Sequence, residues 1–368
     1  MGCMKESITS RPKQKKLLRP DQIKEILDRN VIGQDEAKKT LSVAVYNHFK
    51  RILHKDDPDC RVRLGKSNVI LLGPTGCGKT LLVKTIAEAL DVPCYIQDCT
   101  KITASGYVGS DVEDCLAGLL RSCNYNIAKA ERGIIMLDEG DKIAKRETGL
   151  SITRDVSGEC VQQSLLKIVE GDLVGVPPAG GRKHPEQPLL YVNTQDILFI
   201  LSGAFVGLES IVAKRTGRSC NRIGFGNPSH VADLDGILSE VTAQDLRDFG
   251  LIPEFTGRFP VLTYVDHLDK YTLKRILTDP QDSLTAQYTE LFREDGLDLS
   301  FTPGSLDAVA QCALALGTGA RGLRSIMEKV MRDIMFHAPC KAVRGCTEII
   351  ITEEDVLRVS RKDLREAE

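Results

Sequence analysis

An eight-residue glycine-rich loop constrains the fold of this chain more than any other part of the sequence. The apolar run Val69–Leu72 leads directly into Gly73-Pro74-Thr75-Gly76-Cys77-Gly78-Lys79-Thr80, and a helical pattern begins near Lys79. A strand, a loop of this composition and a helix, in that order, are typical of a phosphate-binding loop. The glycines let backbone N–H groups turn toward a phosphate, and the start of the helix adds partial positive charge. The motif therefore predicts a nucleotide site in an α/β fold.

The residues at the end of this loop predict how a nucleoside triphosphate is held. We expect the Lys79 ammonium to reach the β- and γ-phosphates and the Thr80 hydroxyl to ligate Mg²⁺. The other loop positions are expected to surround the phosphates: Gly73, Pro74, Thr75, Gly76, Cys77 and Gly78.

An apolar strand that ends in two carboxylates lies downstream of the loop. Its sequence is Ile134-Ile135-Met136-Leu137-Asp138-Glu139. We expect Asp138 to hold Mg²⁺, directly or through water, and Glu139 to polarise the water that attacks the γ-phosphate. An acidic pair after a strand is common, but following a phosphate loop it predicts the catalytic carboxylates.

From Asn68 onward, short apolar runs alternate with helical stretches. This alternation is typical of a parallel sheet whose strands are joined by crossover helices. The apolar runs are 69–72, 94–96, 134–137 and 197–201, and the helical stretches are 79–90, 111–130 and 155–170. The sequence therefore predicts a parallel sheet flanked by helices.

The pattern changes after about residue 265, where helices become dominant. They are expected over 269–278, 282–293, 303–316 and 320–336, with a possible strand at 349–351. We therefore predict three parts: a basic mobile arm at 1–19, a large α/β domain at 20–265 and a smaller, mostly helical domain at 266–368.

The composition is that of an ordinary globular protein. The chain has 368 residues, of which 42% are hydrophobic and 27% charged, which is enough for two packed domains. Its net charge of −2 offers no general attraction to nucleic acid or to an anionic membrane. No apolar run reaches the roughly 18 residues that a membrane span needs. We expect neither a nucleic-acid nor a membrane partner.

The twelve cysteines show no zinc-site spacing. Structural zinc sites normally contain Cys-x-x-Cys pairs, and no two cysteines here are separated by two residues. Disulfide scaffolds belong mainly to small secreted domains. We therefore expect no zinc and reduced thiols, as in the cytoplasm or, alternatively, the mitochondrial matrix.

Two arginines could supply positive charge near a γ-phosphate, which phosphoryl transfer requires. Arg258 ends the segment Ile252-Pro253-Glu254-Phe255-Thr256-Gly257-Arg258, and Arg321 follows Gly319-Ala320 at the start of a predicted helix. On residue type alone, either could equally be a surface arginine in an ion pair.

In this order and spacing, the motifs resemble the ClpX family of hexameric AAA+ unfoldases, which pass substrates to the ClpP peptidase. The resemblance runs from about Pro20 to Ile351. Its distinctive stretches are 46–48, 64–68, 105–109, 151–159, 180–185 and 319–325. It implies an AAA+ fold, ATP as the nucleotide and an ATPase that unfolds and threads proteins.

The resemblance also implies roles around the nucleotide. Val31 and Ile32 would form part of the wall around adenine. Arg258 would act as an arginine finger on a neighbour's ATP, and Arg321 would be a sensor of the subunit's own nucleotide. Ser202 is a candidate for the other sensor.

Further loops match the central pore and the peptidase contact of the family. Tyr107 and Val108 would grip substrate, although an aromatic there could also pack locally. Arg182, Lys183 and His184 would line the pore entrance, or form a solvated basic turn. The remaining assignments are Arg154 in the second pore loop and Ile223, Gly224 and Phe225 in the peptidase-docking tripeptide.

The departures from the family pattern carry predictions of their own. The family's zinc-binding N-terminal domain is expected to be absent. Gly140 stands where an apolar residue is usual, which would loosen the backbone beside Glu139. Cys77 replaces a serine, and a thiol near a helix N-terminus is predicted to have a lowered pKa and to react readily.

The predicted function is therefore that of an ATP-dependent unfoldase, a homohexamer that threads unfolded or tagged substrates into a ClpP-type peptidase. The alternative is a peptidase-independent remodelling chaperone or ATP-binding scaffold, against which the tripeptide 223–225 argues. The related HslU unfoldase has a large insertion for which the segment between Glu139 and Ile197 has no room.

Overall fold

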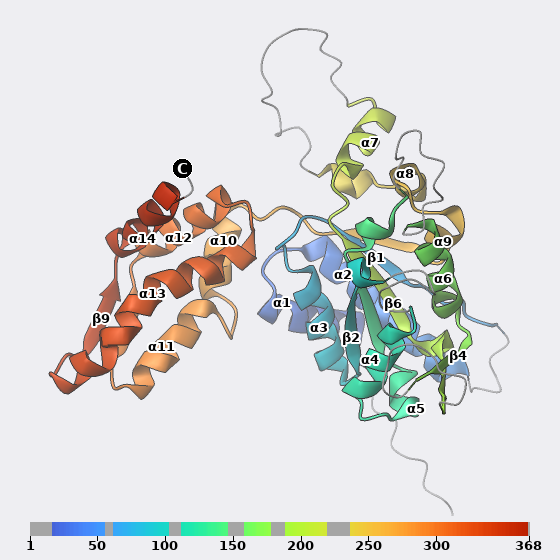
Figure 1. The fold of residues 1–368 in the computed structure, drawn as a ribbon, viewed down its shortest axis with the longest axis horizontal. Helices are drawn as coiled ribbons and strands as arrows, with labels where there is room; N and C mark the ends of the chain where they lie inside the picture. The colour runs from blue at the N-terminus through green and yellow to red at the C-terminus, as the bar shows by residue number, and fades with distance from the viewer. Residues whose placement is uncertain are drawn as a thin grey trace, which may run out of the picture.

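The computed structural model describes residues 17–55, 62–102, 112–145, 158–177, 188–218 and 236–366, with side chains up to residue 359. It consists of an α/β part and a helical part that lie side by side (Figure 1). Within the described residues, no helix is both long and apolar enough to cross a membrane.

A five-stranded parallel sheet forms the centre of the α/β part, in the order β2-β3-β6-β1-β7. Val69 of β1 lies opposite Ile200 of β6 and Val261 of β7. The strands are β1 (Val69–Leu72), β2 (Cys94–Asp98), β3 (Ile134–Asp138), β6 (Leu198–Gly203) and β7 (Val261–Tyr264). Between β3 and β6, β4 (Leu173–Val176) and β5 (Leu190–Asn193) form a separate antiparallel pair.

Alternating side chains of β1 enter two different cores, because successive residues of a strand face opposite sides of the sheet. Val69 and Leu71 belong to a core that contains residues of α1, α2 and α3. Ile70 and Leu72 belong to the other core, with residues of α4, α6 and α7. The helices are α1 (Pro20–Asn30), α2 (Asp35–Lys55), α3 (Lys79–Leu90), α4 (Asp114–Ser122), α5 (Ile127–Ala130), α6 (Glu159–Glu170), α7 (Leu208–Arg215), α8 (Ala243–Phe249) and α9 (Pro253–Gly257).

The helical part follows β7 and is coloured orange to red in Figure 1. Its helices are α10 (Lys270–Thr278), α11 (Leu284–Glu294), α12 (Pro303–Ala315), α13 (Ala320–Val343) and α14 (Glu353–Glu366), and its strands are β8 (Asp298–Phe301) and β9 (Glu348–Ile351). These two strands pair in parallel. The predicted class, a parallel sheet flanked by helices plus a mostly helical C-terminal part, is confirmed.

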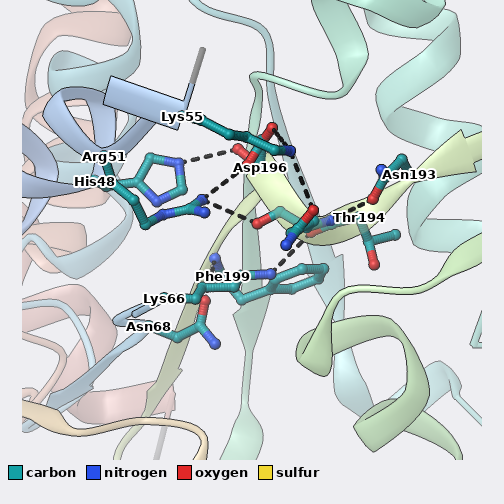
Figure 2. Close-up of polar contacts among 10 residues, drawn as sticks. His48, Arg51, Lys55, Lys66, Asn68, Asn193, Thr194, Asp196 and Phe199 are labelled. Atoms are coloured by element: carbon teal, nitrogen blue, oxygen red, sulfur yellow. Dashed lines mark hydrogen bonds and ion pairs between the residues drawn. The ribbon is translucent and has the colours of Figure 1, made fainter. Parts of the chain in front are cut away.

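A buried polar cluster anchors α2 at the end of the sheet where the inner strands β1 and β6 begin (Figure 2). His48 Nε2 lies 3.0 Å from the Asp196 carbonyl oxygen, and Arg51 pairs with the Asp196 carboxylate at 3.1 Å. Lys66 Nζ donates to the Thr194 carbonyl at 2.9 Å and lies 4.7 Å from the centre of the Phe199 ring. His48 and Lys66 belong to the distinctive stretches 46–48 and 64–68. Their contacts show that they hold α2 and the segment before β1 against residues 194–199.

Burial sets the protonation of this polar cluster. Burial, together with the charge of the nearby Arg51 guanidinium, lowers the pKa of His48 to about 3 and that of Lys66 to about 7. The His48 ring is 3% exposed and is therefore neutral at pH 7.

Candidate nucleotide-binding site

The phosphate loop has a backbone that only glycine adopts without strain at its key turns. Gly76 has a φ of 79° and Gly78 a φ of 93°, and α3 begins at the next residue. A Cβ atom added to Gly76 would collide with the carbonyl oxygen of Thr318. The loop is thus held between β1 and the start of α3, against a turn of the helical part.

Lys79 is a buried cation at this loop. Its side chain is 9% exposed, and Nζ donates to the carbonyl oxygens of Gly73 at 2.6 Å and Pro74 at 2.8 Å. Burial lowers its pKa. Among the described residues no carboxylate forms an ion pair with it, so the ammonium is held by neutral acceptors. A phosphate group would provide the missing negative charge.

The two predicted carboxylates follow one another at the end of β3. The Glu139 N–H donates to Asp138 Oδ1 at 3.1 Å, and Glu139 has a φ of 55°. A non-glycine residue in this region is uncommon and is often found at functional sites. The turn directs the chain from the strand into the short helix η2 (Gly140–Ile143).

Gly140 is tightly enclosed, which differs from the looser backbone predicted there. A Cβ atom at this position would lie 2.8 Å from Leu201 Cγ, well inside van der Waals contact. The glycine is therefore explained by the close packing of η2 against β6.

A cavity of about 610 Å³ brings the predicted residues together. It lies between the α/β part and α13. Its lining includes Thr75, Gly76, Gly78, Lys79, Thr80, Asp138, Glu139 and Arg321. Thr80 and Asp138, the predicted Mg²⁺ ligands, border the same space as Lys79, and a hydroxyl with a carboxylate is the kind of oxygen donor set that Mg²⁺ binds. The residues present fit a nucleotide with its metal ion.

Three charged residues of the cavity lining were not predicted from the sequence. Asp141, whose Oδ1 accepts from the Ala204 N–H at 3.2 Å, and Lys142 follow the acidic pair after Gly140. Arg324 lies one helical turn beyond Arg321. Helical spacing along α13 could have indicated Arg324, because residues three apart in a helix share a face. For Asp141 and Lys142 the signal was their closeness in sequence to the acidic pair.

The predicted adenine wall does not border this cavity. Val31 and Ile32 are 5% and 7% exposed and pack in the core, so their role toward adenine stays a prediction. The adjacent Gln34 holds the connection between the two parts. Its Oε1 accepts from the Asp266 N–H at 2.7 Å, and its Nε2 donates to the Asp266 carbonyl at 3.0 Å.

Arg258 and Ser202 do not line the cavity. Arg258 follows α9, and its guanidinium is half-exposed and paired with Glu170 at 2.6 Å. Within one chain it thus matches the alternative of a surface ion pair, and action on a neighbour's ATP stays a prediction. Ser202 is fully buried, and its Oγ has no hydrogen-bond partner among the described residues.

Cys77 does not have the environment that was predicted for a reactive thiol. Its side chain is 5% exposed and packs in the core shared with α1 to α3. Burial raises the pKa of the thiol, and this outweighs the favourable charge of Lys79. The prediction of a lowered pKa was therefore wrong.

The predicted pore and docking residues lie outside the described residues. They are Tyr107, Val108, Arg154, Arg182, Lys183, His184, Ile223, Gly224 and Phe225. Their roles stay predictions.

Comparison with known proteins gives this geometry a family. Residues 65–262 match the model of an AAA domain (Cdc48 subfamily), and residues 268–345 match that of the C-terminal D2-small domain of ClpB protein. A Borrelia duttonii protein is 51% identical over 346 residues, which cover 94% of this chain and 80% of the relative. It is named "ATP-dependent Clp protease ATP-binding subunit ClpX".

The chain belongs to the ClpX family. Two further ClpX proteins of the same full name support this. The one from Porphyromonas gingivalis is 50% identical over 335 residues, covering 91% of this chain and 81% of the relative. The one from Bacteroides fragilis is 49% identical over 340 residues, covering 92% and 82%. The resemblance to ClpX and the AAA+ fold that it implied are confirmed.

Proposed function

We propose that this chain is an ATP-hydrolysing ClpX subunit that unfolds proteins and works with a ClpP-type peptidase. The observation that supports it most is the cavity that gathers Lys79, Thr80, Asp138, Glu139 and Arg321 between the α/β part and α13. The relatives named as ATP-binding subunits of the Clp protease support the same function.

Binding of ATP uses the loop and its lysine. Backbone N–H groups at the start of α3 and the buried Lys79 ammonium attract the phosphates. Lys79 Nζ now donates to the Gly73 and Pro74 carbonyls. When ATP binds, Nζ would donate to charged phosphate oxygens, in place of these carbonyls or in addition to them. Thr80 and Asp138 would hold Mg²⁺, which neutralises phosphate charge when bound.

Hydrolysis requires an oriented water and positive charge near the γ-phosphate. Glu139 accepts a proton from the water as it attacks, which is the role of a general base. Arg321 reaches the cavity from α13 and stabilises charge on the phosphates. Arg258, half-exposed at the end of α9, is the residue we assign to the nucleotide of a neighbouring subunit in a homohexamer.

Unfolding follows if hydrolysis moves the two parts relative to each other. The cavity lies where they meet, so loss of a phosphate changes the contacts of both sides at once. We assign Tyr107, Val108, Arg154 and 182–184 to the substrate path and 223–225 to the peptidase contact. Cytoplasmic location, or location in a mitochondrial matrix, remains a prediction.

The experiment measures ATP hydrolysis and degradation of a tagged fluorescent protein, with and without ClpP. The wild-type chain should hydrolyse ATP and abolish the fluorescence of the tagged substrate. Peptides should appear only when the peptidase is present. Glu139→Gln should bind ATP and hydrolyse none, while Glu290→Gln, which removes a surface carboxylate paired with Arg293, should behave as wild type. Unfolding without delivery to ClpP would favour the peptidase-independent remodelling chaperone. Wild-type hydrolysis by Glu139→Gln would overturn the assigned base.

A further inference from the structure

Gln162 is a fully buried amide in the first turn of α6 whose donor and acceptor atoms are all in use. Nε2 donates to the Ile143 carbonyl at 2.7 Å and to the Gly250 carbonyl at 3.3 Å. Oε1 accepts from the Ile252 N–H at 2.8 Å. An amide offers two N–H donors and a carbonyl oxygen, so both N–H groups of this side chain are used and its oxygen accepts one bond.

The partners of Gln162 belong to two functionally distinct segments. Ile143 is the last residue of η2, which starts immediately after Glu139. Ile252 is the cap residue of α9, and Arg258 directly follows that helix. Gln162 is therefore hydrogen-bonded to both the carboxylate segment and the arginine segment.

The two segments also meet each other beside Gln162. The Lys145 N–H donates to the Gly250 carbonyl at 2.9 Å. Gly250 has a φ of 117°, and an added Cβ atom would lie 2.5 Å from the Lys145 carbonyl oxygen. Because the backbones touch here, displacement of residues 143–145 has to be taken up at 250–252.

A second contact of α6 reaches Arg258 itself. Glu170, the last residue of the helix, pairs with the Arg258 guanidinium at 2.6 Å. Phe255 of α9 shares a buried core with Val161 and Leu165 of α6. The helix thus holds the arginine segment at its beginning through Gln162 and at its end through Glu170.

We propose that Gln162 is a positioning residue that couples the Asp138–Glu139 end of a subunit's own nucleotide site to Arg258, the residue assigned to the next subunit's nucleotide. This rests on the proposed function. A shift of η2 when the γ-phosphate leaves moves the Ile143 carbonyl, and Gln162 transmits the shift to Ile252 and α9. Glu170 guides the guanidinium at the other end of the same helix.

The test uses the full-length chain with Gln162→Leu, which keeps the size of the side chain and removes all three hydrogen bonds. Gln163→Leu is the matched control, because Gln163 lies next to it on α6 and is exposed. We measure kcat and KM for ATP, affinity for a fluorescent ADP analogue, and the thermal midpoint. Gln162→Leu should lose about tenfold in kcat, since small displacements of catalytic groups have effects of this order. Its ADP affinity should stay within about twofold, and Gln163→Leu should match wild type.

Mixed rings separate positioning of Arg258 from a general structural defect. Gln162→Leu chains are diluted into excess Glu139→Gln chains, which cannot hydrolyse ATP but carry an intact arginine segment. A defect in the supplied arginine should then be repaired by the neighbour, so the deficit per active chain should shrink to about twofold or less, relative to wild-type chains at the same dilution. A deficit that stays the same in mixed rings overturns the proposal, as does a wild-type kcat for Gln162→Leu.

Glu170→Gln provides a second variant in case Gln162→Leu does not fold. Glu170 is surface-exposed, and its substitution removes one ion pair without emptying a buried site. It should show the same repair in mixed rings, and an unrepaired loss contradicts the proposal. Hydrolysis by rings made only of Glu139→Gln would instead refute the proposed function, so the two failures are distinguishable.

Discussion

The backbone N–H of Ala320, the first residue of α13, donates a hydrogen bond to the Gly76 carbonyl of the phosphate loop at 3.0 Å. This bond joins the loop that would bind phosphate to the helix that carries Arg321. The phosphate loop is therefore part of the contact between the α/β part and the helical part as well as of the proposed nucleotide site.

Gly76→Ala should break this contact. Its Cβ atom would collide with the Thr318 carbonyl, and its φ of 79° adds strain for any L-residue. We expect affinity for a fluorescent ADP analogue to fall by at least about tenfold, since the misplaced loop lies at the phosphates. Gly217→Ala is the matched control, because Gly217 has a φ of 72° and open space around it. Equal affinity of the two variants would contradict the assigned contact.

Lys79→Met should separate the stability of the empty protein from its stabilisation by nucleotide. Burial of the ammonium lowers its pKa, which means that the empty fold bears a desolvation cost that methionine avoids. Without nucleotide, we expect the thermal midpoint of Lys79→Met to equal or exceed that of wild type. Addition of ATP with Mg²⁺ should raise the thermal midpoint of wild type but not that of Lys79→Met.

Lys84→Met serves as the control for this comparison, since Lys84 is exposed on the same helix. It should keep the full shift with ATP. An equal shift in Lys79→Met would show that Lys79 contributes nothing to phosphate binding.

His48 should make the protein less stable in mild acid. Its pKa is about 3 in the folded state, against an ordinary value of 6.5, so between these pH values the unfolded chain binds a proton that the folded one does not. Stability from this group is therefore complete above pH 6.5 and falls as pH decreases toward 3. Between pH 7 and 5 the free energy of unfolding should fall by about 2 kcal/mol more in wild type than in His48→Gln.

Urea denaturation at the two pH values measures this difference, with the exposed His267→Gln as control. The control should follow wild type. A pH dependence that is identical in all three proteins would show that His48 does not remain neutral in the fold.

Cys77 should react slowly despite its place in the phosphate loop. It is buried and its thiol has a raised pKa, and the thiolate is the reactive form. With iodoacetamide at pH 7, peptide mass spectrometry should find Cys340, which is exposed, alkylated well before Cys77. Cys77→Ser should retain ATPase activity after mild peroxide no better than wild type does. Selective protection by that substitution would restore the redox hypothesis.

Local patterns in the sequence were sufficient for four of the five strands of the parallel sheet and for the phosphate site. The loop 73–80 and the acidic pair are contiguous, and each carries its structural context in the flanking residues. The strands β4, β5, β7 and β8 were not predicted, whereas the possible strand at 349–351 corresponds to β9. Short strands of this kind acquire their identity from distant partners.

The same limit applies to single side chains. Gln162 looks like any polar position of an amphipathic helix until its three distant backbone partners are known. For Cys77, the rule that a helix N-terminus lowers the pKa of a thiol failed, because burial raises this pKa more strongly. Arg258 could be placed on a turn but not toward a nucleotide, since its proposed partner belongs to another chain.

The two hydrogen bonds between Gln34 and Asp266 fix the point at which the chain passes from the α/β part to the helical part. Beyond this point the helical part includes α13, a rod of 24 residues and hence about 36 Å. Over such a lever arm, each degree of rotation displaces the far end by about 0.6 Å. If hydrolysis rotates the helical part about this connection, the periphery of the subunit, where a neighbour in the proposed ring would lie, would move farther than the residues at the phosphates.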